Sequence, residues 1–166
     1  GHEVSVVHPG AFRTFPCPSY PEIRLAWRPF SGVARRLEEI SPDRIHIATE
    51  GPLGLAARRY CLRRRLRFTT SYHTQFPQYL RARAPVPLAV SFAFLRWFHG
   101  GAARTMVATQ RQREELRARR FENLGAWTRG VDTQLFRPGD PEALADPRPI
   151  WIYVGRVAVE KSIEDF

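Results

Sequence analysis

Short apolar runs rich in β-branched residues alternate with segments of helical periodicity along most of this chain. The runs expected to form strands are residues 4–7, 23–27, 44–47, 68–71, 105–108 and 123–128. The segments expected to form helices are residues 33–40, 53–66, 75–82, 86–99 and 109–119. Strands that alternate with helices are joined by crossover connections and therefore lie parallel. The chain is predicted to be an α/β protein with a parallel sheet flanked by helices.

The composition is that of a globular protein. The 166 residues suffice for one core of ordinary size, and the 43% hydrophobic and 12% aromatic content excludes a disordered chain. No apolar run reaches the roughly 18 residues of a membrane span. Cys17 and Cys61 lie far apart in the sequence and lack metal-ligand spacing, so we interpret them as reduced thiols of a cytosolic protein.

Arginine dominates the charge of the chain. Lysine and arginine total 26 against 16 acidic residues, for a formal net charge of +10, and Lys161 is the single lysine. Such an excess is typical of proteins that bind nucleic acid, anionic lipid or phosphorylated ligands, although a GC-rich genome alone also produces it. Nucleic acid is not expected as a partner, because no aromatic stacking platform is interleaved with the basic residues. Arginines and bulky apolar residues mix over 79–83 and 92–98, which suits either an anionic membrane surface or a helix core.

The end of the chain combines a predicted buried strand, a turn and two cations. Residues 150–154 form the apolar run, Gly155 follows as the turn, and Arg156 and Lys161 come next. This arrangement is one way in which α/β proteins bind a phosphate or a diphosphate. The alternative is that both cations are solvated surface residues. The lone lysine in an arginine-rich chain favours the binding role.

Residues 129–149 interrupt the alternation of strands and helices, because prolines and glycines accumulate there. We therefore predict a first domain over residues 1–142, followed over 143–166 by a linker and the start of a second domain. The first residues resemble the end of a helix that runs into a strand, and the last strand is followed by about one helical turn. Both ends are expected to be cut inside folded structure.

Two loops at predicted strand ends carry residues suited to binding. Gly51 and Gly54 follow the strand 44–47 and let backbone N–H groups approach a ligand, although a plain Gly-Pro turn is the alternative. His73 follows the strand 68–71 between the hydroxyl groups of Tyr72 and Thr74, where it can hydrogen-bond a sugar or a phosphate, and a structural histidine is the alternative. The sequence has no G-x-S-x-G elbow, no P-loop and no metal-ligand spacing, so no metal site is expected.

Five stretches of the sequence occur in the same order in a known enzyme family. They read GHEV at 1–4, IATEGPLG at 47–54, SYHT at 71–74, RGVDT at 129–133 with FRP at 136–138, and YVGR at 153–156 with EK at 160–161. Over essentially its whole length the chain resembles the family-4 retaining glycosyltransferases. It resembles most closely the branch of α-mannosyltransferases, phosphatidylinositol mannosyltransferases and sulfoquinovosyl-diacylglycerol synthases. The resemblance implies the GT-B fold, with this chain as its N-terminal half, a Rossmann-like sheet truncated at both ends.

The resemblance also implies a role for each candidate residue. His73 would be the catalytic residue that faces the cleft. Gly155, Arg156 and Lys161 would bind the diphosphate of the donor, although Ser162 stands where the family commonly has glycine. The residues implied on the acceptor side are Gly51, Gly54, Tyr72 and Thr74.

The implied reaction transfers a hexose, with mannose favoured, from a nucleotide-diphosphate sugar to a lipid or glycan acceptor, with retention of the anomeric configuration. No cofactor or essential metal is implied. The parent protein would be cytoplasmic, with peripheral contact at the inner face of an anionic membrane. The piece itself is expected to be inactive, because the family's first Gly-rich loop and its paired glutamates would lie outside it. The competing interpretation is a basic module without catalytic activity that binds a membrane surface or nucleic acid.

Overall fold

The computed structural model describes residues 1–18, 20–73, 86–127, 130–139, 149–155, 157 and 163. The chain divides into two units, Gly1–Thr128 and Arg129–Phe166, and the regular structure described below belongs to the first. The predicted helix at 75–82 lies outside the described residues. The domain boundary at 142–143 stays a prediction.

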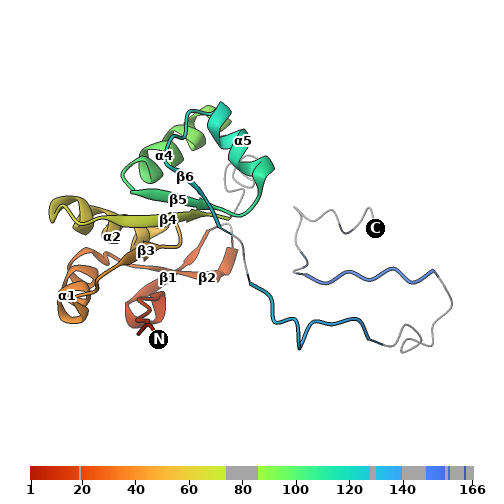
Figure 1. The fold of residues 1–166 in the computed structure, drawn as a ribbon. Helices are drawn as coiled ribbons and strands as arrows, with labels where there is room; N and C mark the ends of the chain where they lie inside the picture. Colours follow the sequence, from red (N-terminus) through yellow and green to blue (C-terminus); the bar gives the residue numbers. More distant parts are fainter. Residues whose placement is uncertain are drawn as a thin grey trace. The chain divides into compact units, whose positions relative to one another are not determined.

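A four-stranded parallel sheet forms the centre of the first unit (Figure 1). Its order is β3 (Ile45–Ile47), β4 (Phe68–Tyr72), β5 (Arg104–Val107) and β6 (Leu124–Ala126). The helices between these strands are α2 (Pro52–Arg63), α4 (Leu88–Gly100) and α5 (Gln110–Ala118). These elements confirm the predicted α/β class with a parallel sheet, and their bounds agree with the sequence to within a few residues.

Helices α2, α4 and α5 all pack on the same face of this sheet. Side chains alternate between faces along a strand, and the register pairs Ile47 with Thr70 and Tyr72 with Val107. Ile47 belongs to a core cluster with residues of α2 and α4, and Tyr72 and Val107 belong to a cluster with residues of α4 and α5. The opposite face of the strands carries His46, which is paired in register with Thr69.

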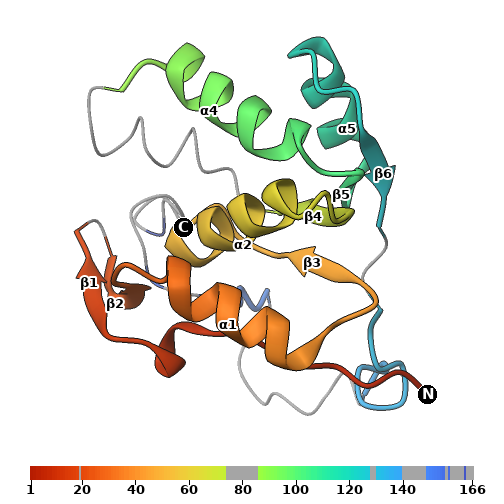
Figure 2. The same ribbon diagram turned by 90° about the vertical axis from the view of Figure 1, so that its left-hand side faces the viewer.

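Helix α1 (Phe30–Ile40) extends the helical layer, and Figure 2 shows it beside α2. Its buried residues Val33 and Leu37 recur at helical spacing and pack on Ala56 of α2. The helix ends where Ser41 adopts a left-handed conformation with φ 46°, and its N–H bonds to the carbonyl of Leu37. α5 begins at Gln110, and the hydroxyl of the preceding residue, Thr109, caps it by accepting a hydrogen bond from the Gln112 N–H.

An antiparallel hairpin lies outside the parallel sheet. The predicted strand 23–27 exists as β2 (Tyr20–Ala26), but it pairs with β1 (Thr14–Cys17), which the sequence analysis missed. A 3₁₀ turn, η1 (Pro9–Ala11), precedes this hairpin. The expectation that every strand belongs to one parallel sheet is therefore wrong here. The short connection between the two strands explains the difference, because a parallel pair needs a crossover of a dozen or more residues.

Two further strand predictions are wrong. Residues 4–7 form no strand, with Val4 78% and Val6 74% exposed, and only Val7 packs against the α1–α2 cluster. Residues 150–154 also form no strand, and Trp151 and Val154 are exposed. An apolar run becomes a buried strand only where a neighbouring strand supplies its ladder hydrogen bonds, and no described strand pairs with either run. None of the described helices is long and apolar enough to cross a membrane.

Candidate functional site

The carboxyl edge of the parallel sheet brings together two of the predicted loops. β3 ends at Ile47, and the chain then forms the loop that leads through Glu50 and Gly51 into α2. β4 ends at Tyr72 and leads into His73. Since β3 and β4 are parallel neighbours, both loops leave the sheet at the same edge, which is where open α/β sheets bind ligands.

The two glycines of the first loop have different surroundings. Gly51 is the residue before α2, and a Cβ added to it would have no heavy atom within 4 Å. Gly54 is buried in the first turn of α2, and a Cβ there would lie 1.9 Å from the carbonyl oxygen of Thr49. Close packing of α2 on the incoming chain therefore requires the glycine at 54, whereas Gly51 leaves open space. The acceptor-side role of both residues stays a prediction.

Tyr72 and His73 are neighbours in sequence but lie in opposite environments. Tyr72 is 4% exposed and packs in the core with Phe92 and Leu95. Burial, with a smaller contribution from nearby carboxylates, raises the pKa of Tyr72 to about 12. His73 is exposed to solvent. Of the two, His73 is therefore available to a ligand, and Thr74 lies outside the described residues.

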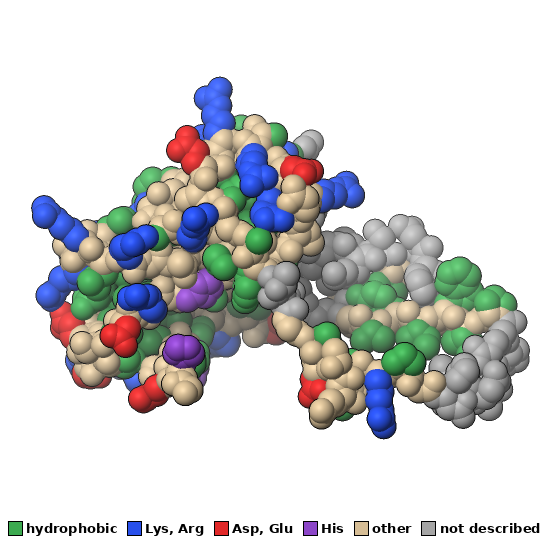
Figure 3. All heavy atoms as spheres, viewed as in Figure 1, with side chains coloured by type: hydrophobic (Ala, Val, Ile, Leu, Met, Phe, Trp, Pro, Cys, Tyr) green, Lys and Arg blue, Asp and Glu red, His purple; other side chains and the backbone are tan. Residues whose placement is uncertain are grey.

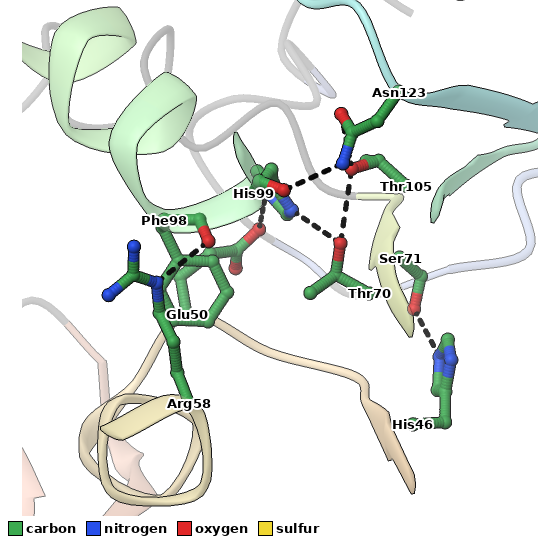
Figure 4. Close-up of polar contacts among 9 residues, drawn as sticks. All are labelled: His46, Glu50, Arg58, Thr70, Ser71, Phe98, His99, Thr105 and Asn123. Carbon is green, nitrogen blue, oxygen red and sulfur yellow. Dashed lines mark hydrogen bonds and ion pairs between the residues drawn. The ribbon is translucent and has the colours of Figure 1, made fainter. Parts of the chain in front are cut away.

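A second histidine, His46, lies near His73. Its Nε2 is 2.9 Å from the Ser71 hydroxyl (Figure 4), and its Nδ1 is 2.8 Å from the Thr69 hydroxyl. Both ring nitrogens therefore have partners on β4. Desolvation lowers the pKa of His46, and the charge of His73 lowers it further. The sequence pattern places His46 in the strand 44–47 and, because it alternates with Ile45 and Ile47, on the opposite face from them.

A buried polar network links the first loop to the middle of the sheet (Figure 4). His99, at the end of α4, is fully buried, and its ring lies between Thr70 of β4 and Glu50 of the loop. Thr105 and Asn123 continue the network. No sequence motif singles out His99 as a site residue. The available signal was its position four residues after Leu95, on the buried stripe of an otherwise apolar helix.

The predicted donor-side cations, Arg156 and Lys161, lie outside the described residues. Gly155, which directly follows the run 150–154, is described. Their role with the donor stays a prediction. Within the described part of the chain, no three histidine, cysteine or acidic side chains gather in a way that could hold a metal ion.

An α/β sheet with loops converging at its carboxyl edge defines a class of ligand-binding folds, and sequence comparison specifies the family. The family model Glycosyltransferase Family 4 matches residues 1–135, so the chain belongs to this family. This membership confirms the family resemblance inferred from the five stretches.

Three relatives with curated names cover between 78% and 99% of the chain. It is 28% identical to the sulfoquinovosyl transferase SQD2 of Arabidopsis thaliana, over 92% of this chain and 32% of the relative. It is also 28% identical to a GDP-mannose-dependent alpha-mannosyltransferase of Corynebacterium glutamicum, over 99% of this chain and 46% of the relative. A GDP-mannose-dependent alpha-mannosyltransferase of Mycobacterium tuberculosis is 28% identical, over 78% of this chain and 36% of the relative. The chain spans about a third to a half of the length of these relatives, and no solved structure matches it.

Proposed function

We propose that this chain is part of a retaining hexosyltransferase that transfers a hexose from a nucleotide-diphosphate sugar to a hydroxyl group of a lipid or glycan. The observation that carries the proposal is the family match over residues 1–135, which covers the whole parallel sheet. Mannose is the favoured sugar because two of the relatives named above are mannosyltransferases that depend on GDP-mannose.

His73 is the proposed catalytic residue. It is exposed at the carboxyl end of β4, so its imidazole can hydrogen-bond the sugar or the phosphate of a bound donor. In a retaining transfer the bond between the sugar and the nucleoside diphosphate breaks, and the acceptor oxygen forms a bond on the same face of the sugar. The proton of the acceptor hydroxyl passes to the leaving diphosphate. A hydrogen bond that strengthens as charge develops on the leaving diphosphate would speed this step.

The proposed donor site adds Arg156 and Lys161 beside Gly155. A guanidinium group can bind two diphosphate oxygens at once, and an ammonium group acts as a compact point charge. The acceptor side is proposed to lie at the loops that carry Gly51 and Thr74. Gly54 and Tyr72, which are buried, would hold these loops in place rather than touch the acceptor. Support for this assignment comes from the open space beside Gly51 and from the shared sheet edge of the two loops.

Transfer by the complete protein tests the proposal. The assay would follow labelled hexose from GDP-mannose, and from UDP-hexoses in parallel, into lipid and glycan acceptors, with NMR to establish the anomeric configuration of the product. We expect His73→Ala to lower kcat by about 100-fold or more. His2→Ala, a change at another exposed histidine, is the matched control and should keep wild-type turnover. A full-length protein that transfers no sugar from any donor, or that inverts the anomer, would refute the proposal.

The isolated chain is expected to show no turnover, because it spans a third to a half of the relatives' length. Turnover by this piece at the rate of a full-length relative would contradict that expectation.

We also propose that the enzyme works on the cytoplasmic side, in peripheral contact with an anionic membrane. The described helices α2 and α4 contain no acidic residue. Val90 is 58% and Trp97 54% exposed on α4, and the Arg58 guanidinium lies 3.9 Å from the centre of the Trp97 ring. Figure 3 shows basic side chains scattered among apolar ones over the face turned to the viewer. Exposed apolar groups flanked by cations are typical of interfacial binding.

Co-sedimentation with vesicles tests the membrane contact. We expect more binding to vesicles that contain phosphatidylglycerol than to phosphatidylcholine alone, and weaker binding for the double change Val90→Ser and Trp97→Ser. Equal binding to both vesicle types would refute it. A DNA filter-binding series across salt concentrations would test the competing nucleic-acid module, and we expect no specific retention.

A further inference from the structure

The hydrogen-bond directions in the buried network follow from Asn123. Its side-chain Nδ2 donates to the carbonyl oxygens of His99, at 2.8 Å, and of Ala102, at 2.7 Å. Carbonyl oxygens only accept hydrogen bonds, so these two contacts fix which end of the amide is nitrogen. The Oδ1 of Asn123 then faces Thr105 and can only accept.

The two threonines transmit this direction to the histidine. The Thr105 hydroxyl must donate to Asn123, at 3.3 Å, so its oxygen accepts from the Thr70 hydroxyl, at 3.2 Å. The single hydroxyl hydrogen of Thr70 is used in that bond. Its oxygen therefore accepts from the Nδ1 of His99, at 2.9 Å. The Nδ1 of His99 carries a proton.

The other ring nitrogen of His99 faces a carboxylate. Nε2 lies 3.1 Å from Oε1 of Glu50, the His99 side chain is fully buried, and the Glu50 side chain is 16% exposed. A neutral ring with its proton on Nδ1 would turn a lone pair toward a carboxylate oxygen inside the protein, which is strongly unfavourable. One proton must therefore lie between Nε2 and Oε1.

We propose that His99 is an imidazolium paired with the carboxylate of Glu50, and that this buried pair makes His99 a positioning residue for the loop at the carboxyl end of β3. In water an imidazole binds a proton more tightly than a carboxylate does. His99 also lies in the last turn of α4, where the helix dipole stabilises a cation. The Arg58 guanidinium, which donates to the carbonyls of Phe98 and Trp97, is a nearby cation that opposes the charge on His99.

The pair joins three elements that are separate in the sequence. His99 comes from α4, Thr70 from β4, and Glu50 from the loop that precedes Gly51. Glu50, the residue before Gly51 and its open space, is thus held by a charged hydrogen bond to His99 in the rigid part of the fold. The positioning of an acceptor loop rests on the proposed function, whereas the protonation of His99 does not.

NMR of the full chain labelled with ¹⁵N-histidine tests the protonation at pH 7. We expect both ring nitrogens of His99 to carry protons in the wild type. In Glu50→Gln the side-chain amide can donate to Nε2, so His99 should become neutral and keep its proton on Nδ1 alone. Glu38→Gln, at the exposed Glu38–Arg64 pair, is the matched control and should leave the His99 signals unchanged. An unprotonated Nε2 in the wild type, or a His99 that stays doubly protonated in Glu50→Gln, would overturn the proposal.

Hydrogen exchange and kinetics test the positioning. We expect Glu50→Ala to speed amide exchange in the loop at Glu50 and Gly51 by about tenfold or more, and Glu50→Gln to stay within about twofold of wild type because it keeps a hydrogen bond to the ring. Wild-type exchange in Glu50→Ala would overturn the positioning role. In the complete enzyme, Glu50→Ala should raise KM for the acceptor more than KM for the donor, and equal changes in both would also overturn it. An enzyme with no activity at all would count against the proposed function, and the NMR and exchange results would still decide the pair.

Discussion

Replacing Gly54 with alanine should destabilise the first unit, because α2 begins in direct contact with the chain that leads into it. A Cβ on Gly54 would lie 1.9 Å from the carbonyl oxygen of Thr49 and 3.1 Å from Cγ2 of Ile47. The closer contact is with backbone, so no rotamer change can relieve it. The first turn of α2 would have to move away from β3.

Two opposing free-energy terms set the size of this effect. Alanine is favoured over glycine in a helix by about 1 kcal/mol, whereas forcing an extra methyl group into a closely packed site costs about 3 kcal/mol. The free energy of unfolding should therefore fall by about 2 kcal/mol. For a chain of this size, that corresponds to a Tm lower by about 4–8 °C.

Urea denaturation followed by far-UV circular dichroism measures the change, with Gly100→Ala as the matched control. Gly100 is the last residue of α4, and a Cβ there would have no heavy atom within 4 Å. The control should therefore be neutral or stabilise the protein by up to about 1 kcal/mol. A Gly54→Ala variant as stable as the wild type would show that α2 does not pack closely on Thr49 and would refute the reasoning.

Three further predictions concern single groups. Thr109→Ala should lower the free energy of unfolding, as measured by urea denaturation, by about 1 kcal/mol, because α5 loses the hydroxyl that caps the Gln112 N–H. An unchanged free energy of unfolding would contradict the capping role. Burial raises the pKa of the Cys61 thiol to about 11, so at pH 8 it stays protonated and iodoacetamide should label Cys17 at least about tenfold faster, by mass spectrometry. The pKa of Tyr72, raised to about 12, should leave this phenol neutral at pH 11 in an ultraviolet titration, and ionisation of every tyrosine by pH 11 would contradict it.

Sequence patterns predicted the strand β4 well because two local signals agree there. The strand at 68–71 is rich in β-branched and aromatic residues, and the helical stripe that precedes it has period 3.6. β4 is also an inner strand of the sheet, so the strand signal in its composition and the structure agree. Periodicity predicts strands and helices but not the protein family. The family motifs indicated that the loops between them are those of a glycosyltransferase.

The wrong strand predictions share one physical cause. Residues 4–7 and 150–154 have strand-like composition, but a strand exists only with a partner, and pairing is not visible in a local window. The sequence did not predict the hairpin of β1 and β2, and the reason is the opposite one. β1 contains Pro16, which weakens a strand signal, and yet the strand forms because its partner β2 lies a few residues away.

The two histidines that sequence reasoning undervalued show the same limit for the site. The sequence pattern places His46 in a strand and His99 in a helix and indicates no further role for either. In the structure each is hydrogen-bonded at both ring nitrogens. Their partners on β4 and in the loop are more than 20 residues away in the sequence. The register of β3 and β4 brings His46 to its partners, and the packing of α4 on the sheet brings His99 to its own. A pattern can place a histidine on a face, but it cannot supply the hydroxyl or the carboxylate that gives the ring its chemistry.

The loop at the end of β3 shows what the sequence and the structure each contribute. The sequence suggested that both of its glycines face a ligand, but Gly54 is required by the close approach of Thr49, and Glu50 is held by His99. Gly51 lies between these two anchors, and it is the loop glycine beside open space. The anchors are independent, since one is a van der Waals contact and the other a charged hydrogen bond. A loop fixed on both sides presents the backbone of Gly51 in one orientation. If the acceptor binds there, as we propose, the loop would lose little conformational entropy on binding.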